Sequence, residues 1–218
     1  MKGDPSGQSM ESPVLMIGVS GGTGAGKSTF VNLLHERLKD RQVLVLRQDW
    51  YYLNLDHLPE MDRGRHNFDH PDSYEGELLL KHLQELKAGH AVDAPQYDYR
   101  IHTRVGYRPF GPARAVIAEG ILIFAGAELR DLFDLRIYVD APDDIRILRR
   151  IERDQIERGR TLDSIRTQYL ETVRPGHERY IAPTKADAHL VVNGTQDFTP
   201  VVDLLARWIL EKIDPRRP

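Results

Sequence analysis

Short apolar runs alternate with segments of helical periodicity along most of this chain. The run at 14–19 is nearly continuous, which is typical of a strand buried on both faces of a sheet. From 29 to 39 the period becomes helical, and a second apolar run follows at 43–46. Because strand, helix and strand follow one another in this order, we expect a right-handed parallel unit and an α/β fold.

Three further strand candidates bring the predicted sheet to about five strands, which is a usual size. They are 116–118 with 121–124, 135–139 and 190–192. Helical patterns occur at 79–89, 144–158, 163–173 with a stop at Pro175, and 201–213. The pattern therefore predicts a mainly parallel sheet with helices on both faces.

A single domain at 14–218 is the simplest organisation of the chain. No sequence block repeats with a period of about 20 to 50 residues, and no Pro/Ser/Gly linker divides the chain. Residues 1–13 are polar and lack the apolar stretch of a secretory signal, so we interpret them as a flexible tail. The segment 50–115 is rich in Tyr, His, Asp, Arg and Pro. Because connections of that length usually have a function, we expect a binding insert there.

Composition and charge exclude several classes of function. The 218 residues include 30 basic and 33 acidic side chains, so no overall positive field predicts binding to nucleic acid or to an anionic membrane. The apolar runs are much shorter than the roughly 18 residues that cross a membrane. The chain contains no cysteine, which excludes disulfides and thiolate catalysis and permits a reducing compartment. We expect a cytoplasmic protein.

A phosphate-binding loop is the strongest motif in the sequence. Between the first predicted strand and helix, the chain matches the P-loop pattern. Glycines let backbone N–H groups curl around phosphate oxygens, and the helix N-terminus favours the same negative charge. Lys27 is expected to reach the terminal phosphates and Ser28 to bind Mg²⁺, so we predict a nucleoside triphosphate ligand. The phosphate-binding candidates here are Gly21, Gly22, Thr23, Gly24, Ala25, Gly26, Lys27, Ser28 and Thr29.

Two acidic residues follow predicted strands at the edge of the sheet where the P-loop lies. Ligands bind beyond the carboxyl ends of parallel strands, and Asp49 comes shortly after the second strand. Glu119 ends the next strand and would lie near enough to hold Mg²⁺, directly or through water. Ser28, Glu119 and Asp49 are therefore the candidate metal ligands. The alternatives are a turn cap for Asp49 and a buried acid paired with a lysine for Glu119.

An arginine cluster occupies the predicted helix after the fourth strand. Its members are Arg146, Arg149, Arg150, Arg153, Arg158 and Arg160. Several of these like charges share one side of the helix, which is unfavourable unless an anion faces them. One interpretation is a solvated helix neutralised by its own acidic residues. The other is a lid, at 143–160, whose guanidinium groups close over the triphosphate and exclude water.

Several sequence blocks together resemble the uridine kinase family, also called uridine-cytidine kinases, within the P-loop kinases. Besides the P-loop, the blocks are Gln48-Asp49-Trp50-Tyr51-Tyr52, Asn67-Phe68-Asp69-His70-Pro71-Asp72, Pro95-Gln96-Tyr97-Asp98-Tyr99, His102-Thr103-Arg104, Glu119-Gly120-Ile121-Leu122, and Arg149 to Arg160 continuing to Gln168-Tyr169. The resemblance runs from Ile17 to about Val192. It implies transfer of phosphate from ATP or GTP, with Mg²⁺, to the 5′-hydroxyl of uridine or cytidine.

The resemblance also implies residue roles in this chain. Asp49 corresponds to the catalytic base, Ser28 and Glu119 to Mg²⁺ ligands, and Asp69 and Arg150 to the groups that bind the ribose hydroxyls. The implied pyrimidine pocket consists of Tyr97, Tyr99, His102, Arg160 and Gln168, lined by Phe68 and Tyr52, and the implied phosphate lid contains Arg153 and Arg158. The family is often tetrameric, and Trp50 or the hairpin around Tyr107 is a candidate contact.

Other functions stay open on the sequence alone. A related P-loop kinase could act on phosphoribulose or pantothenate, although Tyr97 and Tyr99 favour a flat base. A nucleotide-dependent switch is the alternative from another class. The chain lacks the Asn-Lys-x-Asp motif of switch GTPases, and a switch has no need of a large acceptor insert. Without the resemblance, Tyr97 and Tyr99 could be packing residues and His102 a surface residue.

Overall fold

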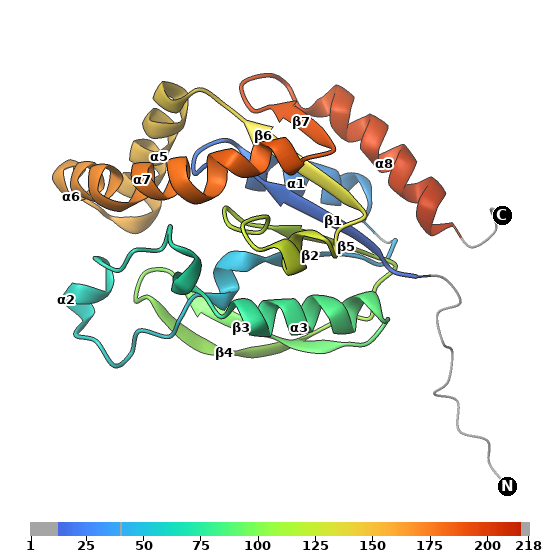
Figure 1. The fold of residues 1–218 in the computed structure, drawn as a ribbon, viewed down its shortest axis with the longest axis horizontal. Helices are drawn as coiled ribbons and strands as arrows, with labels where there is room; N and C mark the ends of the chain where they lie inside the picture. The colour runs from blue at the N-terminus through green and yellow to red at the C-terminus, as the bar shows by residue number, and fades with distance from the viewer. Residues whose placement is uncertain (1–12, 40, 215–218) are drawn as a thin grey trace, which may run out of the picture.

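A parallel five-stranded sheet forms the centre of the computed structural model, which describes residues 13–39 and 41–214 (Figure 1). The strands are β1 (Leu15–Ser20), β2 (Val43–Arg47), β5 (Ala115–Glu119), β6 (Leu135–Asp140) and β7 (Leu190–Asn193). Their order is β2-β5-β1-β6-β7, and each neighbouring pair is parallel. The predicted α/β class and parallel sheet are confirmed.

The position of each strand in the sheet explains its hydrophobic pattern. All residues of β5 and all but Leu15 of β1 are buried, because these strands have helices or loops over both faces and a strand on each side. The edge strands β2 and β7 contain partly exposed or exposed positions. The apolar runs at 14–19 and 116–118 therefore mark central strands, whereas the apolar run at 43–46 belongs to an edge strand.

Two apolar cores lie on opposite faces of the sheet. Ile17 of β1 packs in one core with helices α1 (Lys27–Arg37) and α8 (Thr199–Ile213), whereas its neighbour Met16 packs in the other. Successive side chains of a strand point to opposite faces, so these two clusters must be separated by the sheet. The second core contains Leu79 and Leu83 of helix α3 (Gly76–Lys87). Burying each such leucine contributes about 1.5–3 kcal/mol to stability.

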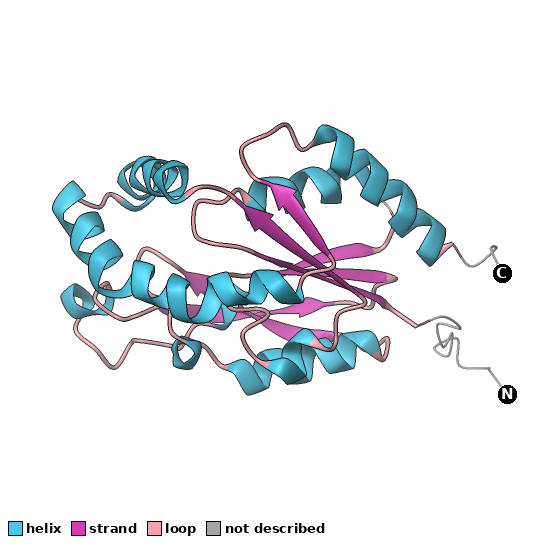
Figure 2. Cartoon of the chain, turned by 45° about the horizontal axis from the view of Figure 1, so that its top comes forward, coloured by secondary structure: helices cyan, strands magenta, loops and turns pink. Residues whose placement is uncertain are grey.

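The segment between β2 and β5, which includes α3, forms a separate layer (Figures 1 and 2). Its strands β3 (Val92–Asp98) and β4 (Thr103–Phe110) pair as an antiparallel hairpin, as expected. The rest of this segment contains η1 (Gln48–Tyr51), α2 (Glu60–Arg63) and η2 (Pro71–Ser73). The insert therefore consists of short elements placed beyond one face of the sheet.

A group of helices lies at one end of the molecule, on the left of Figure 1. The helices between β5 and β7 are α4 (Ala127–Arg130), α5 (Asp143–Arg158), α6 (Leu162–Gln168), η3 (Tyr169–Val173), α7 (Arg174–Gly176), η4 (His177–Ile181) and η5 (Ala182–Asp187). Of these, α5, α6 and α7 form the group. No helix in the described part of the chain is long and apolar enough to cross a membrane.

The expected strand at 121–124 is wrong, because the chain leaves the sheet at Gly120 and forms a turn. Gln48 Oε1 accepts a buried hydrogen bond of 2.9 Å from the Leu122 N–H, and the Ala125 N–H donates to the Leu122 carbonyl. Leu122, Ile123 and Phe124 are nevertheless buried. A buried turn and a buried strand give the same short apolar run, so the sequence pattern alone does not separate them.

Pro175 does not end the helical segment as expected. The helix continues through two wide π-helical turns, η3 and η4, on either side of α7. In η3 the Arg174 N–H donates to the Tyr169 carbonyl, five residues back. Proline lacks an N–H and clashes with the carbonyl four residues earlier, and a wider turn accommodates both effects. Pro175 therefore coincides with a change in the type of helix and not with the end of the helical segment.

The predicted tail at 1–13 lies outside the described residues except for Pro13, and so do residues 215–218 of the predicted domain. Within the described ranges, most helices and strands begin and end within a few residues of the positions expected from the sequence. Helices α1 and α3, for example, end at Arg37 and Lys87, close to the expected ends at 39 and 89.

Candidate active site

The predicted P-loop connects β1 to α1 and curls against the helix that carries the arginine cluster. Gly24 has φ +75°, and a Cβ at this position would lie 2.3 Å from the Arg146 carbonyl oxygen. Only glycine combines this backbone conformation with this close approach. The Lys27 ammonium donates a 3.0 Å hydrogen bond to the Gly22 carbonyl and so lies along the inner side of the loop.

Lys27 is buried, and its electrostatic environment is mixed. Burial lowers the pKa of Lys27 to about 8, while Glu119 and Asp49 oppose this shift and Arg153 adds to it. The ammonium group is therefore mostly protonated at neutral pH but loses its proton far more readily than a surface lysine. A cation in this position can pair with phosphate oxygens.

Glu119 lies at the end of β5, beside the hydroxyl of the P-loop serine. Ser28 Oγ donates to Glu119 Oε2 at 3.0 Å, and Arg47 Nη1 lies 3.4 Å from Glu119 Oε1. Glu119 is only 4% exposed, and burial raises its pKa, although Lys27 and Arg47 oppose the shift. The buried acid thus pairs with an arginine and a serine, where the sequence alternative was a lysine partner.

The oxygen atoms beside the P-loop fit a magnesium ion that is completed by substrate. Mg²⁺ is usually held by one or two carboxylates together with phosphate and water oxygens. Ser28 Oγ and Glu119 Oε2 are adjacent, and Asp49 lines the same cavity. Within the described ranges no cluster of three or more His, Cys, Asp or Glu side chains could hold a metal ion by itself. A metal there would need the triphosphate.

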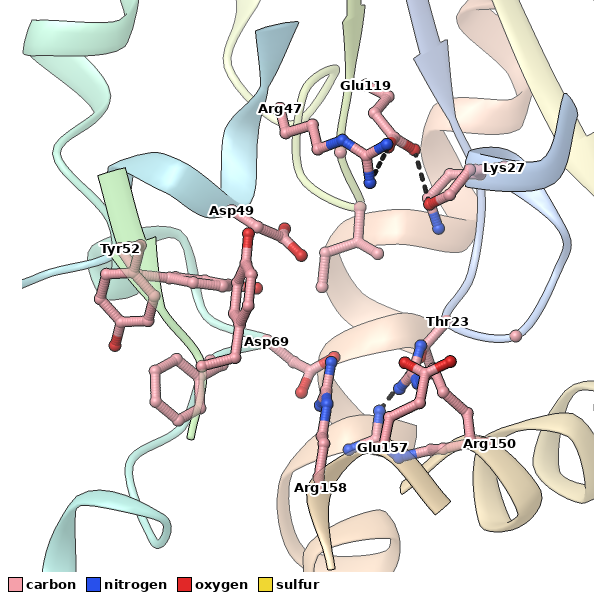
Figure 3. Close-up of a pocket in the computed structure, with 18 of the residues that line it drawn as sticks. Thr23, Lys27, Arg47, Asp49, Tyr52, Asp69, Glu119, Arg150, Glu157 and Arg158 are labelled. Carbon is pink, nitrogen blue, oxygen red and sulfur yellow. Dashed lines mark hydrogen bonds and ion pairs between the residues drawn. The ribbon is translucent and has the colours of Figure 1, made fainter. Parts of the chain in front are cut away.

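Asp49 lies in the short helix η1 directly after β2 and is partly exposed. Its carboxylate makes no hydrogen bond or ion pair within 13–39 and 41–214, so the structure gives it no capping role. Figure 3 shows it between Tyr52 on one side and Lys27 and Glu119 on the other. The Asp49 carboxylate is therefore a hydrogen-bond acceptor inside the cavity.

Aromatic rings from three segments form one wall of the cavity. The rings of Phe68 and His102 stack with their centroids 5.1 Å apart. Tyr52 meets Phe68 edge-on at 4.9 Å and Tyr97 at 5.7 Å, and Tyr97 lies 5.5 Å from Tyr99. Tyr52 and Tyr97 are largely buried, so they pack against neighbours and line the cavity at once. Such a wall can stack on a flat ring.

Two polar side chains on the acceptor side of the cavity have shifted pKa values. Burial raises the pKa of Asp69, Arg150 opposes the shift and Asp49 adds to it. Burial, together with the nearby Arg160 and Arg158, lowers the pKa of His102 to about 4. At neutral pH the His102 imidazole is therefore uncharged, with one nitrogen as a donor and the other as an acceptor.

The arginine cluster contacts the P-loop and also pairs with acidic residues of its own helix. Arg146 pairs with Asp143 at 2.5 Å, and Arg149 Nη1 donates to the Gly194 carbonyl at 2.8 Å. Arg150 Nη1 donates to Thr23 Oγ1 at 3.1 Å. Arg146 and Arg150 are buried, which excludes a purely solvated helix.

One cavity of about 960 Å³ brings the predicted site residues together. All of them line it except Gly21, Gly22 and Ala25, which are buried. Among the lining residues, those not predicted are Arg47, Gln96, Asp98, Arg100, Val105, Gly120, Ile121, Arg149 and Glu157. Arg47 directly follows an apolar strand at the site edge, a signal that could have identified it. Which hairpin residues face the cavity depends on a register shift at Gln96/Tyr97, and the sequence does not predict this shift.

The fold and the site define a P-loop phosphotransferase. A model described as the Phosphoribulokinase / Uridine kinase family matches residues 16–199, and the chain belongs to this family. A uridine kinase from Clostridium novyi is 46% identical over 196 residues, covering 89% of this chain and 94% of that protein. A uridine kinase from Oceanobacillus iheyensis is 42% identical over 201 residues, covering 91% and 95%.

Solved structures with lower sequence identity share the fold. A structure described as a possible uridine kinase from Bacillus stearothermophilus aligns with a TM-score of 0.61 at 19% identity, covering 83% of this chain and 89% of that chain. The family resemblance inferred from the sequence blocks is confirmed by the family match and by the named relatives.

Proposed function

We propose that this chain transfers the γ-phosphoryl group of ATP or GTP to the 5′-hydroxyl of uridine or cytidine, forming UMP or CMP. The main support is the single cavity that joins a P-loop at one end to an aromatic and carboxylate surface at the other. Relatives more than 40% identical over most of their length are named uridine kinase. The aromatic wall argues against phosphoribulose or pantothenate, which have no flat base to stack.

Asp49 is the general base of the proposed reaction. Its carboxylate has no competing hydrogen bond or ion pair within the described ranges and faces the space between the two ends of the cavity. It accepts the proton of the 5′-hydroxyl as the oxygen attacks the γ-phosphorus. The attack is in line with the departing nucleoside diphosphate, ADP or GDP.

Residues of the insert and of α5 and α6 hold the nucleoside. Asp69 accepts hydrogen bonds from the ribose hydroxyls, and Arg150 binds beside it. The base stacks against the wall formed by Tyr97, Tyr99 and Phe68, with Tyr52 behind it. His102, Arg160 and Gln168 contact the polar edge of the base. This assignment is supported by the position of all these residues on one cavity.

The P-loop amides, Lys27, Arg153 and Arg158 bind the phosphate groups and offset the negative charge that spreads over the transferring group. A bound Mg²⁺ would be held by Ser28 and Glu119, with Asp49 near it, and would offset the negative charge of the phosphate groups. The arginines also exclude water, which would otherwise compete with the nucleoside as acceptor.

The test is whether nucleotide consumption depends on the acceptor. Purified protein is incubated with Mg²⁺ and ATP or GTP, with a panel of nucleosides added one at a time. We expect consumption only with uridine or cytidine, and a nucleoside monophosphate as the product. Consumption that is the same without a nucleoside would indicate a hydrolase or a switch. Dependence on a different alcohol would replace the proposed acceptor.

We also propose a cytoplasmic homo-oligomer, with a tetramer as the state expected of the family. The hairpin supports this proposal because Tyr107 is 56% exposed at its surface. Trp50, the other expected contact residue, is only partly exposed, since Arg108 lies 4.4 Å from its ring centre and Phe110 packs on it edge-on.

A further inference from the structure

Asp154 is a fully buried carboxylate that contacts three arginines. It is 0% exposed and lies on the inner side of α5. Arg153 Nη2 lies 2.8 Å from Asp154 Oδ1, Arg158 Nη1 lies 3.5 Å from the same oxygen, and Arg150 Nε lies 3.5 Å from Oδ2. One negative charge therefore sits between three guanidinium groups.

The backbone of Asp154 also fixes how α5 ends. Its carbonyl accepts hydrogen bonds from the N–H groups of both Gly159 and Arg160, the latter at 3.0 Å. Gly159 has φ +62°, the left-handed conformation common after the last turn of a helix. Side chain and backbone of the same residue thus set the direction in which Arg158 and Arg160 leave the helix.

The arginines that contact Asp154 also reach the cavity. Arg150 donates to Thr23 Oγ1 of the P-loop at 3.1 Å and to Gln168 Oε1 at 2.7 Å. Arg153 and Arg158 line the cavity, and Figure 3 shows Arg158 near Asp69 and across from the P-loop. Asp154 itself does not line the cavity, so it has no direct contact with a ligand bound there.

The charge balance favours a role in holding the arginines in place. Three guanidinium groups so close together repel one another, and long side chains in water would separate. Burial acts to raise the pKa of Asp154, but Arg153, Arg158 and Arg150 outweigh it and its pKa lies below the usual value. Burial lowers the pKa of Arg150, and Asp154 is the foremost anion opposing that shift. The carboxylate stays ionised and leaves the group with a net positive charge.

We propose that Asp154 is a positioning residue that holds Arg150, Arg153 and Arg158 in the arrangement that receives the triphosphate and the nucleoside, before either binds. The inference rests on the proposed function for the roles of the arginines. It goes beyond that function because it assigns a task to a residue that touches neither substrate. The side chains are arranged in advance, so substrate binding does not have to order them.

The variant Asp154→Asn separates positioning from charge, because the two effects have opposite signs. Asparagine keeps the shape and one acceptor oxygen but adds a net positive charge beside the cavity. If Asp154 only reduced the positive potential, the variant would bind Mg·ATP more tightly. The proposal expects weaker Mg·ATP binding by titration calorimetry and kcat/KM lower by about 10- to 100-fold, the scale of a misplaced catalytic group. Equal or tighter binding with unchanged kcat/KM would overturn it.

The matched control is Glu152→Gln, which makes the same charge change at an exposed position of the same helix. It is expected to behave like the natural protein in both measurements. Direct binding of Mg·ATP needs no acceptor, so this part of the test still decides the role of Asp154 if uridine and cytidine prove not to be substrates. Loss of acceptor-dependent turnover in the natural protein would count against the proposed function alone.

A measurement on the natural protein covers the case in which Asp154→Asn does not fold. The NMR order parameters of the arginine Nε–H groups are measured without nucleotide, and the Arg153 signal is assigned through Arg153→Lys. Arg153 Nε donates to Asp154 Oδ1 at 2.9 Å, so we expect an order parameter close to the roughly 0.85 of rigid groups. A value below about 0.6, typical of flexible groups, would mean that the arginine is not held in advance and would overturn the proposal.

Discussion

Three carboxylates in the same cavity have different surroundings, and these surroundings separate their proposed roles. Asp49 is partly exposed and unpaired within the described ranges, Glu119 is buried against Ser28 and Arg47, and Asp69 is buried near Arg150. A base must be free to accept a proton, whereas a metal ligand or a ribose acceptor gains from being fixed. Local environment at the residue scale therefore supports one assignment for each acid.

Replacement of Asp49 by asparagine tests the base at this scale. We expect Asp49→Asn to lower kcat by about 10²- to 10⁴-fold while nucleoside binding persists, because the amide keeps the size but accepts no proton. Steady-state kinetics and nucleoside titration measure the two effects. The exposed Glu36→Gln of α1 is the control for loss of a carboxylate, and near-normal turnover of Asp49→Asn would remove Asp49 from the role.

The pKa of Lys27 predicts an alkaline limit for activity. Since burial lowers this pKa to about 8, the cation is present below pH 8 and is lost as the pH rises through that value in the free enzyme. We expect kcat/KM for Mg·ATP to fall above about pH 8 with cytidine as acceptor. Bound phosphates favour the charged form, so the corresponding fall in kcat should lie at higher pH. A kcat/KM that stays constant well above pH 8 would contradict this electrostatic role.

At the scale of elements, the helical segment from α6 to η4 supports the acceptor side of the cavity. A Cβ added to Gly176 would lie 2.7 Å from the Asp69 carbonyl oxygen and 2.8 Å from the Asp69 Cβ. The ring of Tyr180, in the following turn, meets His70 edge-on at 5.0 Å. The segment that Pro175 was expected to end therefore packs directly against the loop that carries Asp69.

Gly176→Ala tests this contact between elements. The backbone at Gly176 is helical, so alanine fits its conformation and would even favour the helix, and the expected cost is steric. We expect a higher KM for the nucleoside, unchanged Mg·ATP affinity and a loss of about 1–3 kcal/mol of unfolding free energy. Gly126→Ala is the control, because a Cβ there would meet no atom within 4 Å. An unchanged nucleoside KM would show that Asp69 does not depend on this contact.

At the scale of the whole molecule, the insert lines the cavity and also has an exposed surface. Tyr97 and His102 line the cavity. Tyr107 of the same hairpin is exposed, and its hydroxyl accepts a 3.1 Å hydrogen bond from Arg104 Nη1. If the hairpin joins subunits as proposed, assembly and nucleoside binding share one element.

A surface substitution tests the assembly. We expect Tyr107→Glu to lower the mass measured by sedimentation velocity, because it places a charge in a contact that assembly would bury. Leu204→Glu is the control, since Leu204 is 67% exposed on α8, at the opposite side of the sheet from the hairpin. Equal masses for Tyr107→Glu and the natural protein would exclude the hairpin as the contact.

The sequence by itself determined the class of the fold and the end of the sheet at which ligands bind. Local rules were sufficient for this: continuous apolar runs identified β1 and β5, and the glycines before Lys27 identified the P-loop. The acids after β2 and β5 could be placed near the P-loop because parallel strands end at the same edge of a sheet.

Only the tertiary structure decided what the chain does after Gly120 and Pro175, and which partners the charged residues have. The turn after Gly120 depends on the distant Gln48, and the pairing of Glu119 with Arg47 depends on the order of strands in the sheet. The contacts of the arginine cluster with Thr23 and with the buried Asp154 likewise became visible only in the structure. These features arise from contacts between residues far apart in the chain, or from the geometry of individual helical turns. The periodicity of hydrophobic positions predicts neither.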